Sequence, residues 1–151
     1  RRAVDATSNL KNVKIFNMTS QEMIAHLTRE MPWLHEKKIL FWLDAHGYGF
    51  EWHLRQEISY VAENYRNAYV LIDDFKVPGL ECFSYDQYGD QECSHEYIRE
   101  SFGNKQYELY YPTYTDRTSS YHPLVGWGLY VMGENFCVPN TLANKMKQYG
   151  A

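Results

Sequence analysis

The sequence contains few cysteines, and their placement excludes two common uses of this residue. Cys82, Cys93 and Cys137 are an odd number and include no Cys-x-x-Cys pair. Disulfide frameworks and structural zinc sites need paired or closely spaced cysteines. We therefore expect neither of them, and a reducing, cytoplasmic compartment fits the sequence best.

Long apolar runs and clusters of basic residues are also missing. No segment approaches the roughly 20 apolar residues that a membrane span requires, and the first residues, RRAVDATSN, lack the apolar stretch of a secretory signal. The formal net charge is −4, and no Lys/Arg-rich run occurs. This charge distribution argues against nucleic acid and membranes as partners and favours a small molecule.

Two catalytic signatures are absent as well. The sequence has no GxSxG elbow and no cysteine with a histidine placed by motif, so nucleophilic hydrolysis has no support. It has no GxxxxGK[ST] loop either, which removes the P-loop mode of phosphate binding.

The length and composition are those of one domain. With 151 residues, 44% of them hydrophobic, the chain can bury one sizeable core, so we expect a single domain spanning residues 1–151. The first residues read like the end of a helix already under way, and no initiator Met precedes them. This suggests the hypothesis that the chain starts within a fold.

The first part of the chain predicts a strand followed by a helix. Residues 13–17, VKIFN, are a short apolar run. The following residues 19–31 have apolar side chains at helical spacing, and Thr19 with Glu22 forms a capping box, in which each side chain binds a free backbone N–H.

Two continuous apolar runs, residues 39–43 and 68–72, predict parallel strands buried on both faces. Residues 50–66 between them predict an amphipathic helix. The first run stops at Asp44 and the second at Asp73 and Asp74. Since parallel pairing with right-handed crossovers is the rule in such units, we expect these acidic ends on one edge of the sheet.

The remainder of the chain is more irregular. Beyond residue 79 a polar stretch extends to about residue 95, which is long enough to indicate a functional loop. A short helix is predicted over residues 94–102, an antiparallel hairpin from residues 107–114 and 126–132, and a terminal helix over residues 140–149.

The acidic strand ends are the main candidate for a site. Ligands bind outside the carboxyl ends of parallel strands, and three converging carboxylates repel one another unless a cation or donors hold them. Asp44, Asp73 and Asp74 are therefore candidate ligands of Mg²⁺ or another divalent cation. The alternative is that Asp44 caps the following turn and that the Asp pair begins a solvated loop.

Two nearby residues are candidate acid–base groups. His46 follows Asp44 in the same strand-end turn, where it could take a proton from a substrate hydroxyl, although a turn-stabilising histidine is an equal alternative. Lys76 could neutralise the acid pair or act as a general acid or base, and a solvated lysine is the simpler interpretation.

These residues resemble the class I S-adenosylmethionine-dependent methyltransferases, especially the cation-dependent O-methyltransferases of catechol and macrocin type. FWLDAH resembles the fourth strand of that fold with its Asp, and LIDDFKVPG resembles the fifth strand with its acid/amide pair. YELYYPTY and GWGLYVMG resemble the sixth strand and the reversed seventh strand. The resemblance implies an α/β, open Rossmann-like sheet, mostly parallel, with an antiparallel C-terminal hairpin.

The resemblance also implies site residues. Asp44, Asp73 and Asp74 match the magnesium ligands of the family, and FNMTS resembles the loop that contacts the adenine, so Asn17, Met18 and Asp44 become cofactor-side candidates. The basic lysine of the catechol-type members is replaced by a glycine three residues after Asp44, so His46 is a substitute and not a match.

The first two strands of that fold, with the glycine-rich loop that binds the cofactor, have no counterpart in the sequence. We therefore expect an unpaired edge along residues 38–43 and a truncated form of a methyltransferase, inactive alone, whose parent methylates a small-molecule or sugar hydroxyl. A homo-oligomer is also compatible with the sequence. The alternatives are a metal-dependent nucleotide-sugar glycosyltransferase, suggested by the Asp73-Asp74 pair, and a non-catalytic scaffold fragment.

Overall fold

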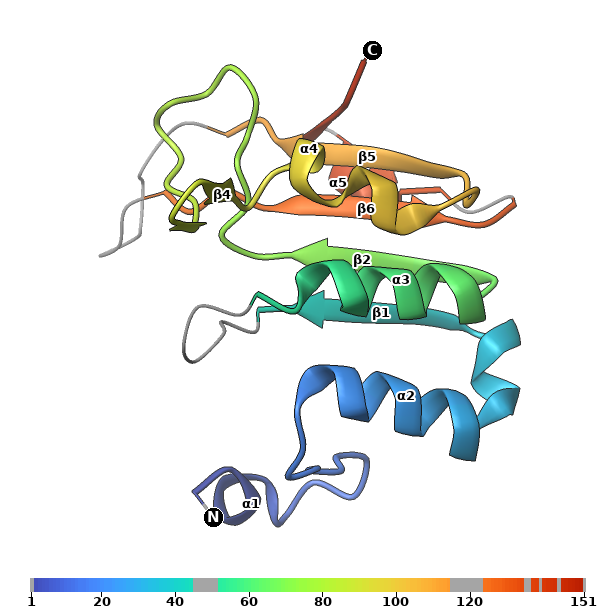
Figure 1. The fold of residues 1–151 in the computed structure, drawn as a ribbon. Helices are drawn as coiled ribbons and strands as arrows, with labels where there is room; N and C mark the ends of the chain where they lie inside the picture. The colour runs from blue at the N-terminus through green and yellow to red at the C-terminus, as the bar shows by residue number, and fades with distance from the viewer. Residues whose placement is uncertain are drawn as a thin grey trace.

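The computed structural model describes residues 2–44, 52–114, 124–134, 137–138, 140–143 and 145–150 (Figure 1). Its strands are β1 (Lys38–Leu43), β2 (Asn67–Ile72), β3 (Gln87–Tyr88), β4 (Gln91–Glu92), β5 (Tyr107–Pro112), β6 (Gly128–Met132) and β7 (Met146–Gln148). Its α-helices are α1 (Arg2–Thr7), α2 (Ser20–Glu30), α3 (Leu54–Asn64), α4 (His95–Ile98) and α5 (Asn140–Ala143). Two 3-10 helices complete the elements, η1 (Pro32–Glu36) and η2 (Arg99–Phe102).

Five of the strands form one mixed sheet in the order β1-β2-β6-β5-β7. β1 and β2 are parallel, as the two apolar runs predicted, and α3 connects them. β6 lies between β2 and β5 and is antiparallel to both, so the predicted C-terminal hairpin is confirmed. The fold is α/β, and within the described residues its parallel part is limited to the β1–β2 pair.

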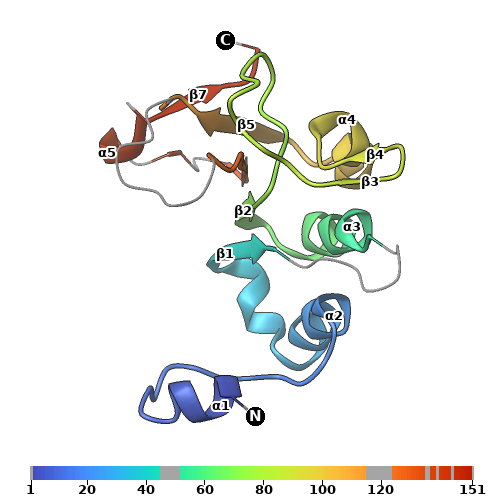
Figure 2. The ribbon, with the colours of Figure 1, turned by 90° about the vertical axis from the view of Figure 1, so that its left-hand side faces the viewer.

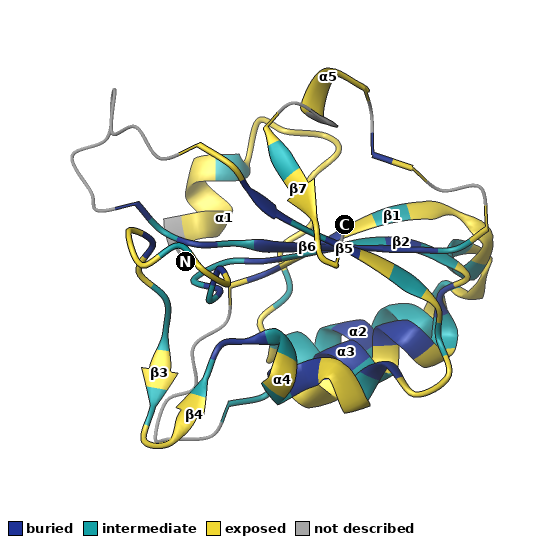
Figure 3. Ribbon diagram, turned by 90° about the horizontal axis from the view of Figure 1, so that it is seen from above, coloured by how far each residue is buried: buried dark blue, intermediate teal, exposed yellow. Residues whose placement is uncertain are grey.

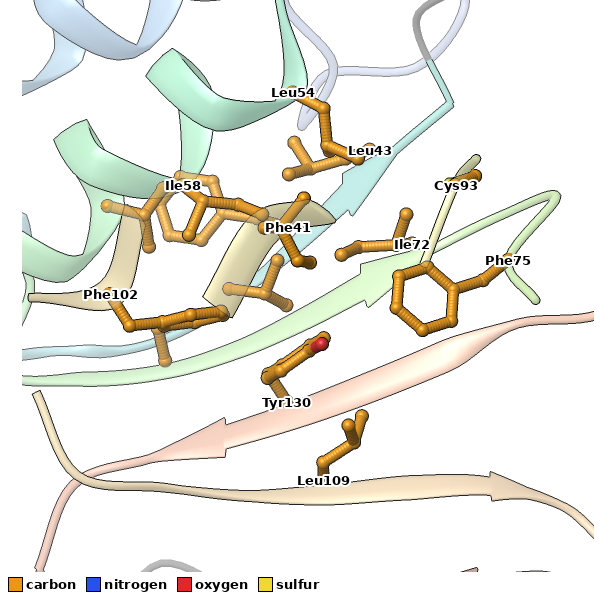
Figure 4. Close-up of a cluster of buried hydrophobic side chains, with 14 of the residues drawn as sticks. Phe41, Leu43, Leu54, Ile58, Ile72, Phe75, Cys93, Phe102, Leu109 and Tyr130 are labelled. Atoms are coloured by element: carbon orange, nitrogen blue, oxygen red, sulfur yellow. The ribbon is translucent and has the colours of Figure 1, made fainter. Parts of the chain in front are cut away.

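Helices cover one face of this sheet. Figure 3 shows α2, α3 and α4 together on the same side. The core lies between this helical layer and the sheet, as Figure 4 shows, and its labelled side chains come from β1, β2, β5, β6, α3, η2 and the loops. Ile58 of α3 and Tyr130 of β6 have no exposed surface. Burial of one such aliphatic side chain stabilises the fold by about 1.5–3 kcal/mol.

The predicted helix start at Thr19 is confirmed. The Glu22 amide donates to Thr19 Oγ1 at 3.3 Å, and the Thr19 amide donates to Glu22 Oε2 at 2.8 Å. The capping box therefore begins α2 at Ser20, and the helix ends before Pro32, as predicted.

Residues 13–17 do not form the predicted strand. They are extended coil, and Val13 and Ile15 are exposed. Figures 1 and 2 show this segment below α2 and apart from β1, and within the described residues it pairs with no strand of the sheet. A strand needs a hydrogen-bonding neighbour, which the local sequence pattern does not reveal.

β1 is not buried on both faces, contrary to the prediction. Leu40 is 59% exposed and Trp42 63% exposed, because they point away from the helical layer. With Tyr69, Leu71, Trp127 and Leu129 they line an apolar hollow of about 440 Å³, which we call the open face. The continuous apolar run therefore gives β1 two apolar faces, and the helical layer covers one of them.

The C-terminal prediction was half right. Residues 140–143 form the short helix α5, but residues 146–148 form β7 instead of continuing a helix. β7 pairs antiparallel with β5 at the outer edge of the sheet, where backbone pairing outweighs local helix propensity. Within the part of the chain described, no helix is long and apolar enough to cross a membrane.

Candidate functional site

The carboxyl ends of β1 and β2 meet at one edge of the sheet, as predicted. The Asp73 amide donates to the Leu43 carbonyl at 3.1 Å, which fixes the two strand ends side by side. Asp44 and Asp73 line one small hollow, which we call the strand-end pocket and which is lined by Leu43, Asp44, Trp52, Leu54, Ile72, Asp73, Asp86 and Cys93. Two of the three predicted carboxylates are thus brought together.

The third predicted carboxylate, Asp74, has a distinctive backbone conformation. Its φ angle is 50°, a left-handed conformation that asparagine and aspartate tolerate better than most residues. Its amide donates to Asp73 Oδ1 at 3.1 Å, and its carbonyl accepts the Asp86 amide at 2.9 Å. Asp74 therefore turns the chain after β2 and anchors the following loop.

Asp86 is a site residue that the sequence reasoning missed. It lines the strand-end pocket, its carbonyl accepts the Cys93 amide at 2.9 Å, and its Oδ2 accepts the Tyr88 hydroxyl at 3.4 Å. These bonds fold the polar stretch after residue 79, with its β3–β4 hairpin, back against the strand ends. The length of that stretch indicated a functional loop, but no periodicity identified Asp86.

The electrostatics of the pocket are strongly negative. Cys93 is 2% exposed, and its burial, followed by the nearby carboxylates of Asp86, Asp74 and Asp73, raises the pKa of its thiol. Burial and then Asp86 also raise the pKa of Tyr88. Both groups stay protonated near neutral pH, so Cys93 is a neutral lining group and not a thiolate nucleophile.

The donor set limits how a metal could be held. Within the described ranges, no group of three or more His, Cys, Asp or Glu side chains is close enough to hold a metal ion. Asp44 and Asp73 nevertheless supply the oxygen donors that Mg²⁺ prefers, and this ion is usually bound by one or two carboxylates together with water and substrate oxygens. The residues fit a Mg²⁺ held in that way.

Lys76 is engaged beside this site. Its Nζ donates to Glu92 Oε2 at 2.6 Å, and the Tyr85 hydroxyl donates to Glu92 Oε1 at 3.0 Å. The hydrogen bond to Glu92 is the main reason why the pKa of Lys76 is raised. The amine therefore stays protonated, so in this arrangement Lys76 can donate a proton but cannot accept one.

The remaining candidates are scattered. His46 and the glycine after it lie outside the described residues. Asn17 and Met18 are exposed in the coil that leads to the cap of α2. Ser20, at the start of that helix, lines the same groove as Asp44, whereas Asn17 and Met18 do not line it.

No protein-family model, no curated protein and no solved structure matches this chain.

Proposed function

We propose that this chain is the substrate-side half of an S-adenosylmethionine-dependent O-methyltransferase, which methylates a hydroxyl of a small molecule or sugar with the help of Mg²⁺. The observation that carries the proposal is the pair of carboxylates, Asp44 and Asp73, at the adjoining carboxyl ends of two parallel strands. Ligands of open α/β sheets bind at this position.

The strand order supports the same proposal. β6 lies between β2 and β5 and runs antiparallel to both, which is the arrangement expected of a reversed seventh strand beside the fifth and sixth. β1 lies at the end of the sheet, where the methyltransferase interpretation expects the absent strands. The adenine-side residues Asn17 and Met18 precede a helix whose first residue lines a groove with Asp44.

Each site residue has a role in this proposal. Asp44 and Asp73 would hold the Mg²⁺, which supplies Lewis-acid polarisation of the acceptor hydroxyl. Asp86 holds the loop against the strand ends and keeps the pocket acidic. His46 is the better candidate for the proton acceptor, because Lys76 is protonated and bonded to Glu92.

The binding of the methyl donor needs more than this chain supplies. Asn17, Met18 and Asp44 would contact the cofactor from one side. We also propose a cytoplasmic enzyme, consistent with free thiols at Cys82, Cys93 and Cys137.

A ligand-dependent melting experiment on the chain tests the proposal. Mg²⁺ should raise the melting temperature, and Asp44→Asn and Asp73→Asn should each abolish the increase, because a ligand that binds the folded state stabilises it. S-adenosylmethionine alone should have no effect. Micromolar binding of S-adenosylmethionine would overturn the assignment as a half, and an absent response to Mg²⁺ would overturn the metal. Stabilisation by a nucleotide sugar with Mn²⁺ would favour the glycosyltransferase instead.

A further inference from the structure

His95 lies where a short helix meets the sheet. It is the first residue of α4, and its ring contacts the rings of Tyr107 on β5, Tyr130 on β6 and Tyr149 after β7, with centroid distances of 6.0, 6.0 and 5.2 Å. The Nδ1 atom of His95 lies 2.9 Å from the Tyr130 hydroxyl oxygen. One titratable ring therefore connects α4 to two strands and to the residue that follows β7.

The Tyr130 hydroxyl depends on this hydrogen bond. Tyr130 has no exposed surface, and its ring contacts Phe75 and Phe102 in the core (Figure 4). Burial raises the pKa of this hydroxyl, so it stays protonated. In the part of the chain that the structure describes, His95 is its one hydrogen-bond partner. A buried hydroxyl proton needs an acceptor, and neutral His95 supplies one through Nδ1.

Protonation of His95 removes this acceptor. Both ring nitrogens of a charged histidine carry a proton, so Nδ1 changes from an acceptor to a donor. If Nδ1 then donates to the Tyr130 oxygen, the hydroxyl proton points into the core without an acceptor. If the hydroxyl does not turn, two donors face each other. Either arrangement replaces a satisfied buried pair with one that costs free energy.

The surroundings of His95 do not offset this cost. The three tyrosines that face the ring from the sheet are neutral in acid and supply no negative charge. On the helical side, Glu96 favours the charged ring and Arg99 opposes it. Burial opposes it most, and the pKa of His95 is lowered as a result.

α4 connects His95 to the strand-end pocket. Cys93, two residues before His95, lines that pocket, and its amide donates to the Asp86 carbonyl at 2.9 Å. Tyr97, two residues after His95, stacks on Trp52 of the pocket wall, with ring centroids 5.1 Å apart and an interplanar angle of 21°. A displacement of α4 therefore moves a backbone support and an aromatic support of the pocket.

We propose that His95 is a pH-sensitive switch: its protonation in acid breaks the bond to Tyr130, releases α4 and Tyr149 from the sheet, and loosens the strand-end pocket. His95 is only half-buried, so the charged ring can turn into water while the core stays folded. Histidine is the side chain whose charge changes most readily near physiological pH. The switch is a property of the fold and does not depend on the proposed cation or methyl transfer.

An NMR titration of isotopically labelled, metal-free protein from pH 8 to pH 4.5 tests the proposal. The ring signals of His95 should titrate with a midpoint below the ordinary 6.5. The indole N–H of Trp52 and the amide of Tyr149, which donates to the Leu109 carbonyl at 2.8 Å, should shift with the same midpoint. Far-UV circular dichroism should stay constant, because the core remains folded.

Three variants identify the sensor. His95→Asn keeps an acceptor near the position of Nδ1 without a titratable ring, so the common shift of Trp52 and Tyr149 should vanish. His53→Gln is the matched control, because it removes the histidine next to Trp52, and it should leave the common shift unchanged. Tyr130→Phe removes the hydroxyl, so the midpoint of His95 should rise by roughly half a unit to one unit.

Four results would overturn the proposal. One is a His95 midpoint at or above 6.5, or one that Tyr130→Phe does not change. Another is a His95 titration that the signals of Trp52 and Tyr149 do not follow. The third is a common shift that His95→Asn retains or that His53→Gln abolishes, which would assign the response to another group. The fourth is a loss of circular dichroism with the same midpoint, which would make the transition global unfolding.

Discussion

Glu57 gives the most informative stability prediction. This carboxyl group projects from α3, is 1% exposed, and has an Oε1 atom without a hydrogen-bond partner among the described residues. Burial raises its pKa above the ordinary value of 4.5, and the Ser20 hydroxyl and His53 offset part of that increase. We therefore expect the ionised group to destabilise the monomer at neutral pH.

The sign of the pH dependence follows from this shift. Because the folded state holds the Glu57 proton more tightly than the unfolded state, the stabilisation is fully present below about pH 4.5 and is lost as the pH rises through the higher folded pKa. The contribution of Glu57 to the free energy of unfolding should thus decline as the pH rises above about 4.5.

Glu57→Gln removes this titration and keeps the shape of the side chain. A buried polar group without a partner costs about 1–3 kcal/mol, and more when it is charged. Since the amide is neutral, we expect the variant to be about 1–2 kcal/mol more stable at pH 7. For a chain of this length this corresponds to an increase of about 2–8 °C in melting temperature.

Urea unfolding at pH 5, 6 and 7 measures the effect. Glu63→Gln, on the exposed side of α3, is the matched control and should change the profile little. If Glu57→Gln is no more stable than the parent at pH 7, and its pH profile runs parallel to that of the parent, the assignment of Glu57 as a buried destabilising acid is wrong.

Three further predictions concern other parts of the fold. Thr19→Ala should lower the free energy of unfolding by about 0.5–2 kcal/mol in a urea titration, because it removes the side-chain acceptor of the capping box. An unchanged midpoint of unfolding would show that the cap is not needed. Asp74→Ala should lower stability by about 1 kcal/mol or more in thermal unfolding, since alanine tolerates a φ of 50° less well than aspartate, and an unchanged midpoint would show that this conformation does not restrict the residue type. His95 Nδ1 shares a hydrogen bond of 2.9 Å with the Tyr130 hydroxyl, and burial is the main cause that lowers the pKa of His95. Its contribution to stability should therefore be present above about pH 6.5 and be lost as the pH falls through the lower folded pKa. His95→Gln should flatten the acid limb of the stability profile, and an unchanged limb would contradict this.

Local pattern was sufficient for the elements whose hydrogen bonds and contacts are close in sequence. The capping box at Thr19, the helix of residues 54–64 and the two apolar strands were all predictable, because periodicity and capping chemistry act within a few residues. The meeting of the acidic strand ends at one edge followed from the parallel pairing of β1 and β2.

The features that were not predictable depend on distant partners. Residues 13–17 have strand chemistry but no neighbouring edge, while Lys147 and Gln148 become a strand because β5 offers one. Leu40 and Trp42 are apolar yet exposed, since α2, α3 and α4 cover the other face and the short helix α5, whose Leu142 lines the same hollow, leaves them open. Asp86 reaches the site through backbone bonds to Asp74 and Cys93, for which the sequence has no periodic signal.

The central claim is that Asp44 and Asp73 form one cation site at the ends of β1 and β2. Addition of substoichiometric Mn²⁺ to isotopically labelled protein tests it, because this paramagnetic ion broadens the amide signals of nearby residues. Signals of residues 43–44, 72–74 and 86 should broaden first, and Asp44→Asn combined with Asp73→Asn should prevent this. Broadening elsewhere, or broadening at these residues that the double variant retains, would contradict the account.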